Sequence, residues 1–263
     1  MGALSAASRV LIIGGGASGA LLATHLLGSH PDVHVSIVEQ RADIGRGLAY
    51  STEQYDHVLN VPAGGMSAFS AEPDHFRLWL VARGLVDRND SFAFVPRRHF
   101  GAYLADVLAE AASGGRLSIV HETALDVRAT PSGVEVVLAN GTSLVGHAAV
   151  LAVGHEAQQA RSRGVAVRVG SEADTPLPPD APVLILGSGL SMVDAWLTLE
   201  QRRHRGPVMV VSRHGLLPQA HRQVEPLQLA AADVPFGTEL HYFAGWFRDV
   251  VREVVGRGGD WRS

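Results

Sequence analysis

The stretch Val-Leu-Ile-Ile-Gly-Gly-Gly-Ala-Ser-Gly, residues 10–19, decides the fold. Its four apolar residues predict a buried parallel strand, because a short continuous apolar run needs cover on both faces of a sheet. Gly14, Gly16 and Gly19 then follow in the spacing G-x-G-x-x-G. In this pattern the first glycine permits a tight turn, the second lets the backbone approach a pyrophosphate, and the third lets the next helix pack closely on the strand.

The residues after the turn complete a dinucleotide-binding unit. Residues 17–27 predict a helix that points its N-terminal N–H groups and its positive dipole end at the phosphates, with Ala17 and Ser18 in its first turn. A second strand, residues 34–38, ends at Glu39, with Gln40 beside it. A carboxylate there can accept both hydroxyls of an adenosine ribose, and it would repel a 2′-phosphate. The alternative is a parallel βαβ unit with a glycine-rich turn and no ligand.

Composition limits the classes of function. The chain has 263 residues, 46% of them hydrophobic, and a net charge of −4 without basic blocks, so we expect neither nucleic acid nor anionic membrane as a partner. It has no cysteine, which excludes disulfides, thiolate metal sites and the redox-active C-x-x-C of disulfide reductases. The 13 histidines lack metal-ligand spacing, so no metal is expected. With no membrane-length apolar run and no signal peptide, the expected location is cytoplasmic.

The opening motif is repeated in the second half of the chain. Residues 183–194 read Val-Leu-Ile-Leu-Gly-Ser-Gly-Leu-Ser-Met-Val-Asp, with Met192 in place of the third glycine. The apolar residues 208–211 predict the partner strand, and Ser212 and Arg213 follow it where an acid would otherwise stand. A hydroxyl and an arginine suit a 2′-phosphate, which favours NADPH over NADH. The alternative is a purely structural βαβ unit. The predicted contacts in the turn are Gly187, Gly189, Leu190 and Ser191.

Further segments carry a family resemblance. They are Gly-Arg-Gly-Leu-Ala-Tyr-Ser-Thr at residues 45–52, Leu-Asn-Val-Pro-Ala at 59–63, Met-Ser at 66–67, and the runs 73–80 and 96–104. With the N-terminal fingerprint they resemble the bacterial FAD-NAD(P)-binding family, whose activities are mostly unassigned. The likeness extends more distantly to flavin-dependent N-hydroxylating and Baeyer–Villiger monooxygenases. It implies an α/β fold of two Rossmann-like units, the first for FAD and the second for NAD(P)H.

The resemblance adds candidate contacts with FAD outside the fingerprint. Residues 45–67 contain glycines, a proline and few charges, which indicates irregular backbone held against a cofactor, the alternative being a long surface loop. An arginine at 97–98 could bind the pyrophosphate or lie solvated. His155 could be catalytic or structural. The candidate contacts are Gly47, Leu48, Asn60, Ser67, Arg98, Ala152 and Gly154.

The remaining pattern predicts how the units are joined. Helices are expected at 74–83, 99–112 and 243–255. Strands are expected at 117–120, 124–129, 134–138 and 144–153, with turns at 131–133 and 140–141. The resemblance implies an antiparallel β-meander inserted in the first unit before its last parallel strand. We expect an FAD-binding domain at 1–157, a proline-containing linker at 158–182 and an NAD(P)-binding unit at 183–263. The return that normally completes the FAD domain is missing, so the chain is either a shortened protein or a piece of a longer one.

These features predict an FAD- and NAD(P)H-dependent oxidoreductase. Hydride would pass from NADPH to FAD, and the electrons then to oxygen, as in a monooxygenase, or to another acceptor. The alternatives are a reductase for a partner protein and a non-catalytic dinucleotide-binding module. The substrate would be a small molecule whose identity the sequence does not reveal. The sequence also leaves the oligomeric state open and indicates no catalytic residue.

Overall fold

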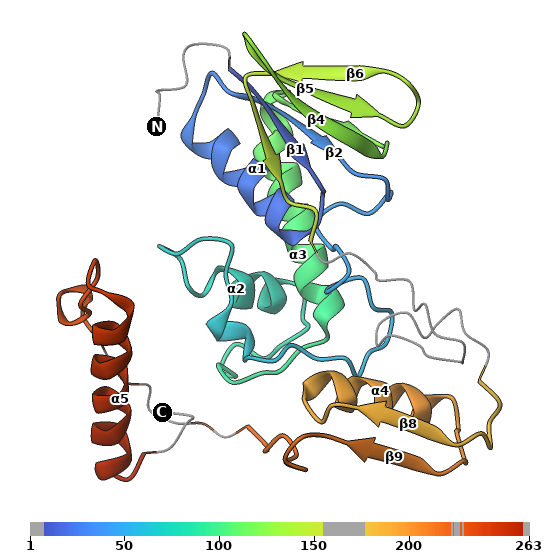
Figure 1. The fold of residues 1–263 in the computed structure, drawn as a ribbon, viewed down its shortest axis with the longest axis vertical. Coiled ribbons are helices and arrows are strands. Elements are labelled where there is room, and N and C mark those ends of the chain that lie inside the picture. The colour runs from blue at the N-terminus through green and yellow to red at the C-terminus, as the bar shows by residue number, and fades with distance from the viewer. Residues whose placement is uncertain (1–7, 155–176, 222, 224–226, 228, 260–263) are drawn as a thin grey trace. The chain divides into compact units, whose positions relative to one another are not determined.

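The computed structural model describes residues 8–154, 177–221, 223, 227 and 229–259. The chain divides into two compact units, Met1–Gly215 and Leu216–Ser263. His155 and residues 158–176 of the expected linker lie outside the described residues. The α/β fold class predicted from the sequence is confirmed, as the following paragraphs describe (Figure 1).

A four-stranded parallel sheet forms the centre of the first unit. Its order is β3-β2-β1-β7, and its strands are β1 (Arg9–Ile13), β2 (His34–Val38), β3 (Leu117–Val120) and β7 (Ala148–Leu151). Helices α1 (Ala17–Ser29) and α3 (Arg97–Ala111) pack on one face, where Val10 and Ile12 are buried. Leu11 and Ile13 point to the opposite face and are buried there as well. The continuous apolar run of β1 is therefore covered on both sides, as its sequence predicts.

The second face of the parallel sheet is covered by an antiparallel sheet (Figure 1). Its order is β4-β5-β6, with β4 (Ala124–Thr130), β5 (Gly133–Leu138) and β6 (Ser143–Gly146). Alternate residues of β5 point inward, as expected for a strand with one buried face: Val134, Val136 and Leu138 pack in the cluster that holds Leu11 and Ile13. The inserted meander is thus the cover that the parallel sheet requires.

The prediction of one strand over residues 144–153 is wrong. The chain leaves the antiparallel sheet after Gly146 and enters the parallel sheet at Ala148. Between them, the His147 backbone N–H donates to Arg9 O over 2.8 Å, and the Arg9 N–H donates to His147 Nδ1 over 2.9 Å. A Cβ on Gly146 would lie 2.8 Å from Leu11 Cγ, so a glycine is needed where the two sheets meet. The apolar residues on both sides of Gly146 and His147 hide this change of sheet from sequence analysis.

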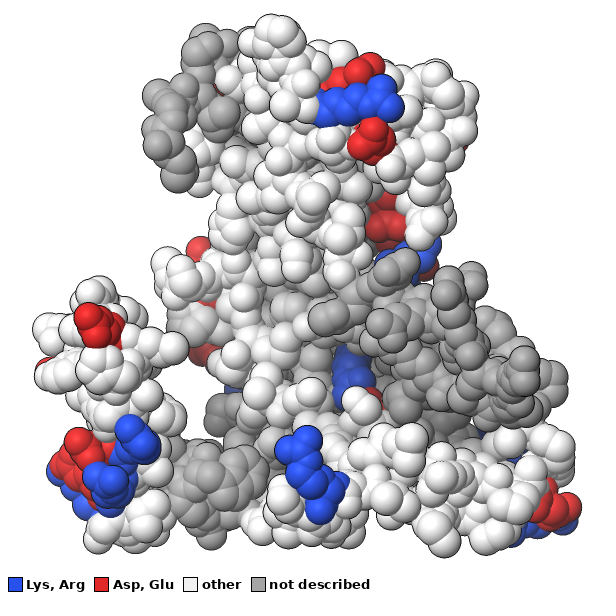
Figure 2. Space-filling model, in the orientation of Figure 1, with Lys and Arg blue, Asp and Glu red and all other residues white. Residues whose placement is uncertain are grey.

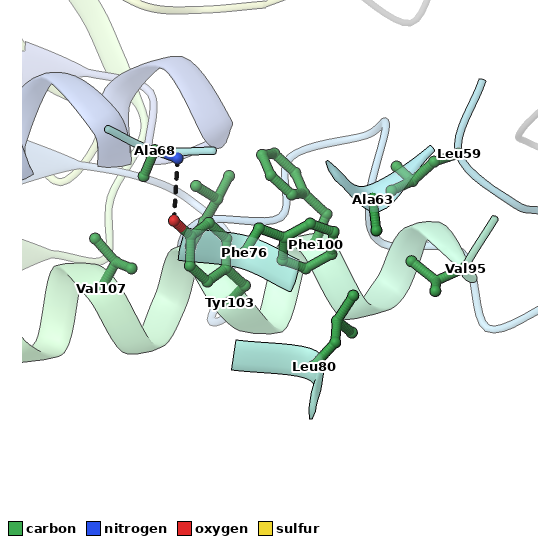
Figure 3. Close-up of a cluster of buried hydrophobic side chains, with 10 residues drawn as sticks. Leu59, Ala63, Ala68, Phe76, Leu80, Val95, Phe100, Tyr103 and Val107 are labelled. Carbon is green, nitrogen blue, oxygen red and sulfur yellow. Dashed lines mark hydrogen bonds between the residues drawn. The ribbon is translucent and has the colours of Figure 1, made fainter. Parts of the chain in front are cut away.

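A third group of buried residues lies beneath α3. It joins α3 to η1 (Ala63–Gly65) and α2 (His75–Ala82), while η2 (Ala112–Gly114) follows α3. Figure 3 shows the group, with Phe76, Phe100 and Tyr103 at its centre. Helix α3 begins at Arg97, two residues before the predicted start, so the arginine pair lies in the helix and not ahead of it. The prediction that the aromatic residues of 74–83 belong to the core is confirmed for Phe76.

The repeated motif forms a smaller βαβ unit. It consists of β8 (Val183–Leu186), α4 (Leu190–Gln201) and β9 (Val208–Val211), and β8 pairs with β9 in parallel. Ile185 is buried, whereas Leu184, Leu186 and Met209 on the other face of the two strands are more than half exposed. In the parallel sheet around β1, strands β4–β6 cover the equivalent face, and no described element does so here.

The unit Leu216–Ser263 contains η4 (Ala231–Asp233) and α5 (Leu240–Gly256). The helix predicted at 243–255 lies inside α5, which begins three residues earlier. None of the described side chains of α5 is buried. Among the described residues, no helix has both the length and the apolar character needed to span a membrane.

Candidate functional site

The first glycine turn connects β1 to α1 and lies at the carboxyl end of the parallel sheet. Gly14 has a φ of +106°, which favours glycine, and its N–H donates to Val38 O of β2 over 2.8 Å. A Cβ on Gly14 would lie 2.3 Å from Ala152 O, and one on Gly19 would lie 2.0 Å from Gly14 O. These close approaches to backbone leave no room for side chains. The roles predicted for the first and third glycines therefore have a structural basis.

Glu39 lies directly beside this turn. Its Oε2 accepts a hydrogen bond from the Gly15 N–H over 2.8 Å, and its Oε1 accepts one from the Arg41 N–H over 3.0 Å. Burial raises the pKa of the Glu39 carboxyl, but the backbone hydrogen bonds from Arg41 and Gly15 and the Arg41 guanidinium together bring that pKa below its ordinary value. The carboxylate is thus ionised at neutral pH and held against the turn, where a ribose would bind.

Replacing Glu39 by glutamine tests this arrangement. At neutral pH we expect Glu39→Gln to lower the free energy of unfolding by about 1–2 kcal/mol, since the amide NH₂ cannot accept one of the two hydrogen bonds. Because the folded-state pKa of Glu39 lies below 4.5, the stabilisation is present above that pH and is lost as the pH falls through the folded-state value.

Urea unfolding at several pH values measures this difference. The difference in the free energy of unfolding between wild type and Glu39→Gln is expected to disappear as the pH falls. The exposed Glu110→Gln on α3 serves as the control and should leave stability nearly unchanged at every pH. If this difference in the free energy of unfolding stayed constant down to the acid transition, ionised Glu39 would not stabilise the turn as described.

Both glycine turns leave a helix N-terminus available for an anion. Neither α1 nor α4 has a side-chain cap or an acidic residue in its first turn. The first N–H groups of a helix have no acceptors within the helix, and they carry the positive end of its dipole. A pyrophosphate supplies the missing acceptors and the complementary charge. Ala17 and Ser18 open α1, and Leu190 and Ser191 open α4, in the positions predicted for phosphate contacts.

The loop that contains Gly45 and Gly47 lies against the first glycine turn. The Gly45 N–H donates to Gly15 O over 2.7 Å, and a Cβ on Gly16 would lie 3.2 Å from Gly47 Cα. Gly47 has a φ of +56°. The glycines of residues 45–52 therefore permit a close backbone approach to the turn, which favours the cofactor-contact interpretation of this segment. On the other side, the Ala152 N–H donates to Ile13 O, so that this predicted residue also lies at the turn.

The second turn repeats the backbone of the first. Gly187 has a φ of +100°, against +106° for Gly14, and its N–H donates to Val211 O over 2.8 Å, as Gly14 does to Val38 O. Gly189 caps α4 with φ −80° and ψ −170°, close to the −68° and −170° of Gly16. Two stretches far apart in the chain thus adopt the same strand, turn and helix. This arrangement is the one that dinucleotide-binding units use to hold a phosphate.

The two βαβ units differ in the residue that follows their second strand. Ser212 follows β9 where Glu39 follows β2, and its Oγ accepts a hydrogen bond from the Gly215 N–H over 3.1 Å. Arg213 stands next to it and is exposed. Met192 replaces the third glycine, and its N–H donates to Gly189 O over 2.9 Å. The predicted groups Gly187, Gly189, Ser212 and Arg213 thus come together at one end of β8 and β9.

The remaining predicted residues have partners of other kinds. The Asn60 Oδ1 accepts from Arg97 Nη2 over 3.1 Å. The Ser67 hydroxyl donates to Glu72 O and accepts from the Phe69 N–H, within its own loop. The Arg98 guanidinium carbon lies 5.3 Å from the centre of the Tyr55 ring. Gln40, Leu48 and Gly154 are exposed. These positions stay predictions as cofactor contacts.

Sequence reasoning missed residues that the fold places at the turns. A Cβ on Gly15 would lie 2.9 Å from Glu39 Cβ, and one on Gly45 would lie 3.0 Å from Ala105 N in α3. The run of three glycines at 14–16 is a signal for the first; nothing local indicates the second. His57 and Arg97, which bind Asp194 of α4, and Asp194 itself were also not predicted as site residues.

Charges and potential metal ligands add no further site. Figure 2 shows arginine and acidic side chains next to one another at several places on the visible face, in line with exposed ion pairs such as Arg128–Asp126 and Arg205–Asp180. Among the described residues, no group of three or more His, Asp or Glu side chains is arranged to hold a metal ion.

Three solved structures that resemble this fold are oxidoreductases. An ornithine N-hydroxylase from Kutzneria sp. 744, solved with reduced FAD, NADP⁺ and L-ornithine, is 19% identical with a TM-score of 0.63, and the match covers 95% of this chain and 68% of that one. A flavin-containing monooxygenase from Stenotrophomonas maltophilia is 20% identical with a TM-score of 0.55, covering 87% and 61%. A bacillithiol disulfide reductase from Staphylococcus aureus is 17% identical with a TM-score of 0.51, covering 95% and 65%.

At these identities the likeness shows the fold alone, which is that of flavin-dependent oxidoreductases. The chain spans about three fifths of the length of the Stenotrophomonas enzyme. Comparison with curated proteins gives no match. The profile of the FAD-NAD(P)-binding family matches residues 11–156, more than half of the chain, and the chain therefore belongs to that family.

Proposed function

We propose that the protein binds FAD at the first glycine turn and NADPH at the second, and that it is an oxidoreductase of the monooxygenase type. The observation that carries the proposal is the duplicated turn, in which Gly14 and Gly187 have the same backbone conformation and the same hydrogen bond to the neighbouring strand. A protein that binds one dinucleotide needs one such turn. Two of them suit the transfer of electrons between two dinucleotides.

The assignment of FAD to the first turn and of NADPH to the second follows from the residue after the second strand of each βαβ unit. Glu39 is an ionised carboxylate that can accept ribose hydroxyls, which suits the adenosine ribose of FAD. Ser212 and Arg213 in the other unit suit a 2′-phosphate, because a guanidinium forms charge-assisted hydrogen bonds with phosphate oxygens. The flavin, when bound, accepts a hydride from the nicotinamide, and the chain contributes binding and orientation.

The acceptor of the electrons is proposed from chemistry and fold. A disulfide reductase of this fold relies on cysteines to pass electrons to its substrate, and this chain has no cysteine. Oxygen requires no such residue, and monooxygenases and an N-hydroxylase share the fold. The substrate of the proposed reaction is a small molecule.

An absorption spectrum of the purified protein tests the proposal directly. We expect bound flavin to give an absorption band at about 450 nm. This band should bleach when NADPH is added anaerobically and should return when air is admitted. A flavin band that resists NADPH would refute the second cofactor, and a protein that stays colourless with added FAD would refute the first. Bleaching with electron delivery to an added acceptor but no oxygen uptake would identify a reductase instead.

The preference for NADPH has its own test. We expect Arg213→Gln to reduce the ratio of NADPH to NADH affinity by about tenfold, because it removes the charge that faces the 2′-phosphate. Titration of each nucleotide followed by fluorescence measures the ratio. Arg205→Gln removes another exposed arginine of the same unit, one that pairs with Asp180, and should leave the ratio unchanged. An unchanged ratio in Arg213→Gln would contradict the assignment of that residue.

A further inference from the structure

The guanidinium of Arg97, at the start of α3, connects three parts of the first unit. Its Nη1 donates to Asp194 Oδ2 in α4 over 2.7 Å, its Nη2 donates to Asn60 Oδ1 over 3.1 Å, and its Nε donates to Val58 O over 2.9 Å. The Asp194 side chain is 12% exposed and that of Arg97 20% exposed. Such a pair is shielded from water on most sides, so its geometry is strongly determined.

His57 makes a second connection to the same turn of α4. Its Nε2 lies 3.1 Å from Asp194 O and 3.1 Å from Thr198 Oγ1, and its Nδ1 lies 2.9 Å from Thr52 Oγ1. The Thr198 hydroxyl donates to Asp194 O over 2.9 Å. The carbonyl therefore accepts from that hydroxyl, and the imidazole Nε2 lies within hydrogen-bond distance of both groups. His57 is buried, so this contact excludes water.

The position of α4 determines where a ligand of the second turn lies. Helix α4 begins at Leu190, directly after Gly189, and Asp194 is little more than one helical turn further along. Asp194 is held by His57 and by Arg97 at the start of α3, and Arg97 also donates to Asn60, which is a predicted flavin contact. The same arginine thus contacts the side expected to hold the flavin and the helix expected to hold NADPH.

We propose that Arg97 and Asp194 are positioning residues that set the distance between the two bound cofactors, with His57 in support. This inference rests on the proposed function, since it concerns hydride transfer between two dinucleotides. Hydride transfer needs the reacting atoms within about 3–3.5 Å, and an error of about 1 Å can cost about 100-fold in rate. Two long nucleotides anchored at separate turns meet that condition only if the turns are held at a defined separation.

The first test measures that separation without any cofactor. Because the chain has no cysteine, Glu110→Cys on α3 and Glu200→Cys on α4, both at exposed positions, accept two spin labels and no others. Pulsed electron paramagnetic resonance should give one narrow distribution of the distance between the two labels in this double-cysteine protein. Adding Asp194→Asn should broaden it, while Asp194→Glu should restore the narrow distribution. A distribution as narrow in Asp194→Asn as in the parent would overturn the proposal, whatever the cofactors do.

The second test separates positioning from binding. In anaerobic single-turnover reduction, Asp194→Asn should lower the limiting rate at saturating NADPH by about 10- to 100-fold, with the apparent dissociation constants of FAD and NADPH changed less than about twofold. Asp194→Glu should recover most of the rate. The matched control is Asp180→Asn, which breaks an exposed aspartate–arginine pair in the same unit and should leave the rate unchanged.

The outcomes distinguish failure of this proposal from failure of the function. A wild-type protein that binds no flavin, or is not reduced by NADPH, contradicts the proposed function, and the label distances then still test the connection. Normal limiting rates in Asp194→Asn overturn the positioning role. Loss of flavin binding in both Asp194→Asn and Asp194→Glu would also overturn it, because the pair would then serve only to maintain the fold.

Discussion

Replacing Gly19 by alanine is expected to destabilise the protein by about 3 kcal/mol and to abolish flavin binding. A Cβ at this position would lie 2.0 Å from Gly14 O and 3.3 Å from Ile12 Cγ2. The first of these atoms belongs to the backbone of the turn, so relief requires α1 to move away from β1. That movement separates the helix N-terminus from the turn and removes the cradle for the pyrophosphate.

A second glycine of the same helix provides the control. Gly28 also lies in α1, and a Cβ on it meets no atom within 4 Å. Gly28→Ala is expected to stabilise the protein by about 0.5–1 kcal/mol, because alanine has the higher helix propensity. Urea unfolding and flavin absorbance of the two variants check both expectations. Equal stability and equal flavin content in Gly19→Ala and Gly28→Ala would refute the close-packing role of Gly19.

Replacing Tyr103 by alanine is expected to lower the free energy of unfolding by about 3–5 kcal/mol. The Tyr103 ring is fully buried and packs against Phe76 and Phe100, with ring centres 5.0 Å and 5.6 Å away (Figure 3). Its hydroxyl oxygen accepts from the Ala68 N–H over 3.0 Å and lies 2.8 Å from His75 Nδ1. Truncation therefore leaves a cavity between α2 and α3 and an unsatisfied backbone N–H.

Two further variants separate the contributions of the ring and of the hydroxyl group to this loss of stability. Tyr103→Phe keeps the ring and removes the hydroxyl, so it should cost about 1–2 kcal/mol, the penalty for the unpaired Ala68 N–H. Tyr242→Ala truncates an exposed tyrosine and should change stability by less than about 0.5 kcal/mol. Denaturant unfolding measures all three. If Tyr103→Ala were no more destabilising than Tyr242→Ala, the buried cluster would not be the core described above.

The first βαβ unit could be predicted because its signals are local. A strand of continuous apolar residues, glycines at fixed spacing and an acid after the next strand each constrain neighbouring backbone, and the predicted bounds of β2, β3 and β9 agree with the structure. The same reasoning found the repeat at Gly187 and Gly189, whose backbone angles match those of Gly14 and Gly16. Residues outside the motifs, such as Ser67 in a loop and Arg98 at the start of α3, lacked such constraints, and their neighbours were not predictable.

The sequence by itself determined the two strand–turn–helix units, the carboxylate at Glu39 and the lack of cysteine chemistry, because each depends on residue type or on spacing within a short stretch. Only the tertiary structure decided where the chain changes sheets at Gly146 and which side chain meets Asp194. Arg97 and Asp194 are 97 residues apart, and no periodicity relates them. Their contact exists because the fold places α4 beside the start of α3 and brings two charges together largely out of water, and that placement depends on the whole chain.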